Sequence, residues 1–313
     1  MGSDAVHERS GTPGVVGVDV QRAHGGGLVR EVGMEEGTIR DFWAAHPCGE
    51  VLVGGIQGDY ERFFKEYDEY RYKHLDHIPG CLDRIGFGGK KVLEIGLGLG
   101  ADSEQIIRRG GRYSPLDLTK ESIERVATRF RLRNLAYDEL KVGSALEIPF
   151  EDNSFDIVFS HGVLHHIPDI ATAQREIARV LKPGGMLVAM LYAKYSMNYL
   201  VSISVARRAA LAALVALRVK PGGKVGKHVE NARRLGLFEY LKDENFLGPN
   251  TDGPENPYSK VYDVAEVRKV FADFEVVKTY KNCMHAPPFP VKWLPLGGLL
   301  GWCLWAHMVP RGK

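Results

Sequence analysis

The sequence predicts an α/β fold with a seven-stranded, mostly parallel sheet that has helices on both faces. From Lys90 onward, short apolar runs alternate with helical patterns, which is the order expected of a parallel sheet. One of these runs ends in a glycine-rich turn that opens a helix, as in Rossmann-like sheets. The 313 residues are 44% hydrophobic and 26% charged, the composition of an ordinary globular protein.

The N-terminal part is expected to cap this sheet. Residues 1–37 lack periodicity and contain the run HGGG, so they are interpreted as a flexible tail before a single domain over 38–313. They hold no apolar segment typical of a secretory signal. Two helices then precede the first strand, TIRDFWAAH and the aromatic-rich GDYERFFKEYDEYRYKHLDH.

Strands and helices follow in alternation. The first strand is KKVLEIG, followed by a helix near 102–109, the strand YSPLDL and the helix TKESIERVATRFRL. The strands ELKVGS, SFDIVFS and GGMLVAMLYA come next, with a helix over 169–181 before the last of them. After the helix DVAEVRKVFADF, the segments DFEVVKTYK and GWCLWAHMV complete the predicted sheet.

Residues 194–262 form an insertion too long for an ordinary connection, and we interpret them as a helical substrate lid. Within the segment 197–227, an apolar run is broken by Arg207 and Arg208 and followed by four basic residues. No run reaches about 18 uncharged residues, so a membrane span is not expected. The segment could contact a membrane surface peripherally, cover an apolar substrate or simply pack against the domain.

The composition argues against several classes of ligand and binding partner. The formal charge is +2 and the basic residues are dispersed, which gives no support for nucleic-acid binding. The four cysteines have neither CxxC nor Cys/His ligand spacing, so no disulfide framework and no metal site is predicted. A cytoplasmic protein is expected, and the oligomeric state is left open.

The turn after the first strand carries the cofactor signal. Glycines at Gly96, Gly98 and Gly100 let a ligand approach the backbone, and Asp117 follows at the distance of a ribose-binding carboxylate. This spacing also fits a dinucleotide site, and thus an NAD-dependent oxidoreductase. Glu94 would repel a pyrophosphate, which favours a cofactor bearing an amino acid.

Further motifs separate these alternatives. FDIVFS at 155–160, VLHHIPD at 163–169 and RVLKPGG at 179–185 follow in order. With them, the chain resembles the class I S-adenosylmethionine-dependent methyltransferases of the ubiquinone and small-molecule type over roughly 88–192. It is similar, more narrowly, to bacterial members with an FW…PCG segment and a helix ending in RY. The resemblance implies S-adenosyl-L-methionine as cofactor and methyl transfer as activity.

The resemblance also implies roles for individual residues. Asp117 would bind the ribose hydroxyls and Leu118 would flank the adenine. The methionine half of the cofactor would be surrounded by Glu94, Gly96, Gly98 and Gly100.

Other cofactor contacts are implied less directly. Where the family often has Gly-Asp-Ala near the adenine amino group, this chain has Ser144 and Ala145 after Gly143. Ser144 can accept a hydrogen bond there, but without charge assistance. Ser160 would line the gap between cofactor and substrate, and Tyr72, or else Tyr70, would close over the cofactor.

Methyl transfer is an in-line displacement, so alignment of the reacting atoms supplies much of the catalysis. A base is needed only when the acceptor must lose a proton. The candidates are His161, at the end of the fourth strand, and His165, although His165 and His166 could instead hold the turn before Pro168. A secondary metabolite, quinone-like ring or isoprenoid would suit the apolar insertion as acceptor, and a catalytically silent binding protein is the main alternative.

Overall fold

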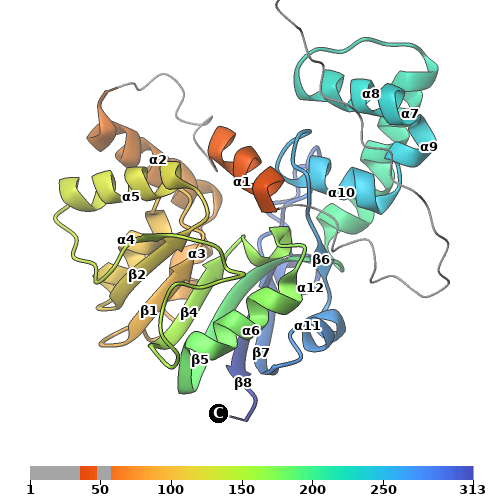
Figure 1. Cartoon of the computed structure of the whole chain (residues 1–313). Coiled ribbons are helices and arrows are strands. Elements are labelled where there is room, and N and C mark those ends of the chain that lie inside the picture. Colours follow the sequence, from red (N-terminus) through yellow and green to blue (C-terminus); the bar gives the residue numbers. More distant parts are fainter. Residues whose placement is uncertain (1–35, 48–57, 313) are drawn as a thin grey trace, which may run out of the picture.

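A computed structural model of the chain describes residues 36–47 and 58–312 (Figure 1). Helices lie on both faces of one central sheet, as the sequence predicts. The predicted tail up to residue 35 and the Cys48-Gly49 part of the FW…PCG segment lie outside the described residues. Helix α1 (Glu36–Ala45) and helix α2 (Tyr60–His74) are the two predicted N-terminal helices.

The described sheet has eight strands, against seven predicted. Seven run in the order β3-β2-β1-β4-β5-β8-β7, and the short β6 pairs with the end of β5. β8 is antiparallel to both of its neighbours, and the other pairs are parallel. The strands are β1 (Lys91–Ile95), β2 (Arg112–Asp117), β3 (Lys141–Val142), β4 (Phe155–His161), β5 (Leu181–Ala193), β6 (Val261–Tyr262), β7 (Phe274–Asn282) and β8 (Cys303–Pro310).

Each face of the sheet carries its own apolar core, because successive residues of a strand point to opposite sides. Val92 packs into one core and its neighbour Leu93 into the other. The first core is covered by α3 (Ile78–Leu82), α4 (Ala101–Arg108) and α5 (Lys120–Leu132), and the second by α6 (Ile170–Val180) and α11 (Val264–Val270). Both faces of the sheet are therefore buried, which leaves the ends of the strands as the places where a ligand could reach the sheet.

The insertion after β5 is helical and stands out beside the sheet (Figure 1). It begins with the continuous helical stretch of η4 (Asn198–Arg207) and α7 (Arg208–Ala216). The helices α8 (Gly223–Leu235), α9 (Leu237–Tyr240) and α10 (Asp243–Thr251) follow. A last short helix, α12 (Gly297–Leu300), lies between β7 and β8.

Candidate active site

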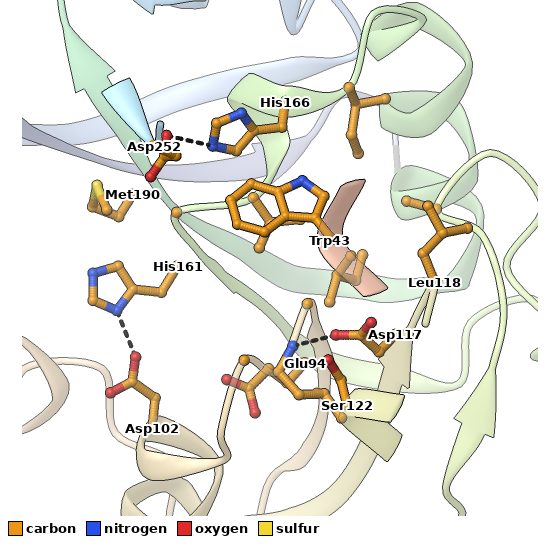
Figure 2. Close-up of a pocket in the computed structure, with 18 of the residues that line it drawn as sticks. Trp43, Glu94, Asp102, Asp117, Leu118, Ser122, His161, His166, Met190 and Asp252 are labelled. Carbon is orange, nitrogen blue, oxygen red and sulfur yellow. Dashed lines mark hydrogen bonds and ion pairs between the residues drawn. The ribbon is translucent and has the colours of Figure 1, made fainter. Parts of the chain in front are cut away.

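A cavity of about 580 Å³ opens at the carboxyl ends of β1, β2, β4 and β5. This is the edge at which open α/β sheets bind ligands, and the volume suits a small molecule. Helix α1 contributes Trp43, and the insertion contributes Thr251 and Asp252. In Figure 2, Trp43 stands between the side of Asp117 and Leu118 and the side of His161 and Met190. The cavity therefore has two ends, separated by one aromatic side chain.

The glycine turn between β1 and α4 forms one wall. Gly96 has a φ of +78°, and a Cβ atom there would lie 2.2 Å from Cγ2 of Val163, so no larger residue fits without displacing that side chain. Gly96 and Gly98 line the cavity, as the resemblance implies. Gly100 is instead the left-handed N-cap of α4 and does not line it. Its place is structural, because it lets the chain turn into the helix.

Asp117 ends β2 as a buried carboxylate held in one orientation. Its Oδ2 accepts from the Leu97 N–H at 2.8 Å, and its Oδ1 accepts from the N–H and hydroxyl of Thr119 at 2.8 and 2.7 Å. Burial raises the pKa of this carboxyl. The Thr119 hydroxyl also lies 2.8 Å from Oγ of Ser122 and can donate there instead. Each carboxylate oxygen of Asp117 can then accept one more hydrogen bond, which fits the pair of hydroxyls on a ribose.

Glu94 lies at the floor of the cavity, almost fully buried. Its carboxyl accepts hydrogen bonds from Ser103, at 2.6 Å, and from the Tyr113 hydroxyl. Burial, with a smaller contribution from the Asp102 carboxylate, raises the pKa of Glu94 to about 8. A cation bound beside Glu94 would favour the ionised form of this carboxyl, whereas a pyrophosphate would gain no attraction from it. The Glu94 carboxyl oxygens can accept hydrogen bonds, which fits the amino group of S-adenosylmethionine.

His161 ends β4 and lines the same cavity beside Asp102 of α4 (Figure 2). Its Nδ1 lies 2.5 Å from Asp102 Oδ2, and the Arg71 guanidinium lies 2.6 Å from the same oxygen. Although burial opposes ionisation, Arg71 and His161 hold the pKa of Asp102 well below its usual value. An ionised Asp102 favours the tautomer with a proton on Nδ1, which leaves the lone pair on Nε2. This arrangement can orient a general base.

The other end of the cavity is mainly apolar and aromatic. Met190, Tyr192 and Trp302 line it, and the ring of Tyr192 stacks on that of Trp302 at 4.3 Å between centroids. Polar groups enter from His166 and Asp252, whose Nε2 and Oδ2 atoms lie 3.4 Å apart. An acceptor that is flat and apolar, with one or two polar groups, suits these walls.

Five predicted site residues lie outside the lining: Tyr72, Gly100, Ser144, Ser160 and His165. Tyr72 and Ser160 both donate to backbone carbonyls at 3.1 Å, of Ala101 and Ile95 respectively. Ser144 bonds to the Glu36 side chain and to the Leu146 N–H. These hydroxyls hold the walls of the cavity rather than face into it. The predicted site residues Leu118 and Ala145 do line the cavity.

The prediction that His165 is catalytic needs correction. The ring is fully buried behind the cavity wall, with its centroid 3.7 Å from that of Tyr192. Burial, followed by the charge of His166, lowers the pKa of His165 well below its usual value. Neutral and packed against an aromatic ring, His165 supports the wall. Its neighbour His166 reaches the cavity instead.

Several lining residues are absent from the sequence-based site. Asp102 contacts His161 and Arg71 contacts Asp102, while Trp43 and Asp252 enter from segments outside the strand-helix alternation. A signal existed for Asp102, because it follows the glycine turn directly in the first turn of α4. Trp43 and Arg71 belong to the FW…PCG and RY motifs of the narrower resemblance, but those motifs assigned them no role, and the place of Asp252 depends on how a distant segment packs.

Known proteins that are similar to this chain are methyltransferases. Residues 93–189 match the methyltransferase domain family. Over 141 residues the chain is 32% identical to a ubiquinone biosynthesis O-methyltransferase of Neisseria meningitidis, covering 44% of this chain and 57% of that protein. Over 120 residues it is 32% identical to a phthiotriol/phenolphthiotriol dimycocerosates methyltransferase of Mycobacterium tuberculosis, covering 38% and 43%. The chain thus spans about half the length of these relatives.

One solved structure supports the fold over nearly the whole chain. It is a chain of the complex containing the Haloferax volcanii Trm112 methyltransferase activator. The TM-score is 0.50 at 16% identity, and the match covers 88% of this chain and 98% of that one. The likeness concerns the fold alone, and it extends beyond the segment that matches the domain family.

Proposed function

We propose that this chain, which carries a class I S-adenosylmethionine-dependent methyltransferase domain, methylates a small, partly apolar molecule that bears a hydroxyl or similar group. The observation that carries this proposal is the two-ended cavity. Glu94 and Asp117 lie at one end, aromatic side chains line the other, and His161 lies on the side of Met190 (Figure 2).

S-adenosylmethionine supplies, when bound, an activated methyl group on a sulfonium. The protein's part is then to align an acceptor with that methyl and to accept a proton. Asp117 and the glycine turn would hold the cofactor, and Trp43, Tyr192 and Trp302 would hold the flat face of the acceptor. During methyl transfer, Nε2 of His161 would take the proton that the acceptor loses.

The acceptor class we favour is a quinone-like ring or a comparable hydroxylated apolar compound, such as an isoprenoid or secondary metabolite. The aromatic lining supports this, as do the relatives, whose names give ubiquinone biosynthesis and dimycocerosates. The insertion 194–262 would act as the substrate lid, since its α10 places Thr251 and Asp252 on the cavity. A cytoplasmic location stays a prediction.

Calorimetric titration with S-adenosylmethionine, S-adenosylhomocysteine and NADH tests the cofactor. We expect binding of the first two alone, and Asp117→Ala is expected to weaken it about tenfold or more, because a charge-assisted hydrogen bond is worth about 1.5–3 kcal/mol. Asp138→Ala, which removes a surface carboxylate paired with Arg112, serves as the control. Binding of NADH alone would overturn the proposal. Cofactor binding without turnover over a broad acceptor panel would favour the silent alternative.

The start of the insertion would also reach a membrane surface. The helical stretch Asn198–Ala216 is long and apolar enough to cross a membrane, yet only 17% of its most apolar window is buried in the protein. Arg207 turns inward and donates to the carbonyls of Asn250 and Pro287, and Arg208 pairs with Asp243. The two charges expected to interrupt this helix thus face the protein, while Val205 is 60% exposed.

We propose that this exposed apolar side lies on an anionic lipid surface. The exposed basic residues Arg218, Lys220 and Lys224 follow it directly and complement such a surface. Vesicles containing phosphatidylglycerol should sediment with the protein, and those of phosphatidylcholine alone should bind less. Val205→Asp should lose most of this binding, whereas Val277→Asp, at an exposed valine of β7, should not. Equal binding by both variants would contradict the proposed surface.

A further inference from the structure

Three side chains that can bind a metal ion, one imidazole and two thiols, meet at the acceptor end of the cavity. They are His77 at the start of α3, Cys283 just after β7, and Cys303 at the start of β8. One nitrogen or sulfur atom of each lies within 4.8 Å of the other two. All three residues line the cavity already described. His77 precedes both cysteines by more than 200 residues, so no spacing in the sequence marks the three as a set.

The backbone fixes the two thiols side by side. Cys303 pairs in register with Asn282, directly before Cys283, and the Trp302 N–H donates to the Cys283 carbonyl at 2.8 Å. Cys283 has a φ of +64°, in the left-handed region that non-glycine residues seldom occupy. Such strain is held where the surrounding structure determines it, and it often accompanies function.

The imidazole of His77 gives an independent indication of a ligand. Its Nε2 is buried and, among the described residues, has no hydrogen-bond partner. Buried polar atoms in proteins are nearly always satisfied, so an unsatisfied one points to a missing group.

We infer that His77, Cys283 and Cys303 bind one divalent transition-metal ion, with Zn²⁺ as the ion that best suits the donors. One imidazole nitrogen and two thiolates are borderline and soft ligands, which favour zinc over magnesium or calcium. Binding would displace the two thiol protons to solvent, and the two thiolates would balance the charge of the ion. Three protein ligands leave the fourth tetrahedral position open, as in catalytic rather than structural zinc sites.

The open position would face the cavity and take an oxygen or sulfur atom of the methyl acceptor. A bound ion lowers the pKa of a coordinated hydroxyl or thiol, so the acceptor would lose its proton more readily. His161 lines the same cavity and could receive that proton. This role rests on the proposed methyl transfer, whereas the metal site itself does not.

Titration of the reduced, chelator-treated full chain with Co²⁺ tests the site. We expect thiolate-to-cobalt charge-transfer absorption that saturates at one equivalent and is reversed by Zn²⁺. His77→Ala and Cys303→Ser should each lose or strongly weaken it. Cys81→Ser is the matched control, because Cys81 is a buried neighbour whose sulfur accepts from Asn282 and does not belong to the cluster. Thermal unfolding of each variant verifies that it is folded.

Two results would overturn the inference. One is the absence of the charge-transfer absorption in the wild-type chain, and the other is its persistence in both cluster variants. If the absorption is absent and mass spectrometry under non-reducing conditions finds a Cys283–Cys303 disulfide, the pair is a redox pair instead. Calorimetry with S-adenosylmethionine on the same samples separates the two proposals. Cofactor binding without cobalt binding removes only the metal site, and cobalt binding without cofactor binding counts only against methyl transfer.

Discussion

Replacing Arg129 with methionine is expected to lower the free energy of unfolding by about 3 kcal/mol, the effect of removing one partner from a buried ion pair. The side chain of Arg129 is 1% exposed. Its guanidinium contacts Glu104 at 2.9 Å and both oxygens of Asp68 at 2.6 and 2.7 Å, and it donates to the Leu99 carbonyl. Methionine fills similar space but leaves these carboxylates with less positive charge, since Arg133 alone would then contact both.

This network joins α2, α4 and α5, and α2 carries Tyr67 and Arg71 into the cavity. The variant should therefore also bind S-adenosylmethionine less tightly. Urea unfolding measures the first effect and calorimetry the second. Arg131→Met, at an exposed position of the same helix, should leave both nearly unchanged. Unfolding free energies that agree for the two variants would show that the buried network adds no stability.

The central sheet could be predicted because its signals are local. KKVLEIG becomes β1, and FDIVFS falls within β4, because an apolar run between turn residues suits a buried strand whatever its neighbours are. The two-residue β6 was missed, since it is too short to show any period and lies in the loop after α10. The position of β8 between β5 and β7 depends on pairing over long distances, which periodicity does not encode.

The insertion shows a second limit of sequence patterns. Arg207 and Arg208 interrupt an apolar run in the sequence, and this argued against a membrane span. In the structure both side chains reach back to carbonyl or carboxylate groups of the protein, so the opposite side of the helix is apolar. The sequence shows how many charged residues a helix contains, but only the folded structure shows the direction in which each charged side chain points.

The candidate site also has one part that sequence motifs predict and one part that they do not. Gly96, Gly98 and Asp117 adjoin one turn, so their motif brings them to the cavity. The surroundings of His161 and the cluster of His77, Cys283 and Cys303 arise only when distant segments pack. The absence of a metal-site spacing in the sequence was therefore no guide to the thiols and imidazole of this cluster. Sequence motifs therefore predicted the part of the cavity around the glycine turn better than the part around His161 and the two cysteines.

At the acceptor end, His161→Ala is expected to lower kcat by about 10²- to 10⁴-fold, the usual contribution of a general base, with cofactor affinity unchanged. The reason is the geometry of the Asp102 contact. With Nδ1 held 2.5 Å from Oδ2 of that carboxylate, Nε2 is left to take a proton. Release of S-adenosylhomocysteine with an acceptor from the panel measures kcat, and calorimetry measures cofactor binding. His74→Ala, at an exposed histidine of α2, is the control.

The Asp102→Asn variant separates orientation from mere packing. The amide preserves the shape of the side chain but loses the charge that favours the Nδ1–H tautomer, so kcat should fall while the protein stays folded. Because Asp102 also pairs with Arg71, cofactor affinity has to be measured alongside. Added imidazole should partly restore the activity of His161→Ala by replacing the missing base, whereas it cannot correct a misplaced ring in Asp102→Asn. An unchanged kcat in His161→Ala would mean that the acceptor needs no protein base, as for an acceptor that carries a free lone pair and no acidic proton.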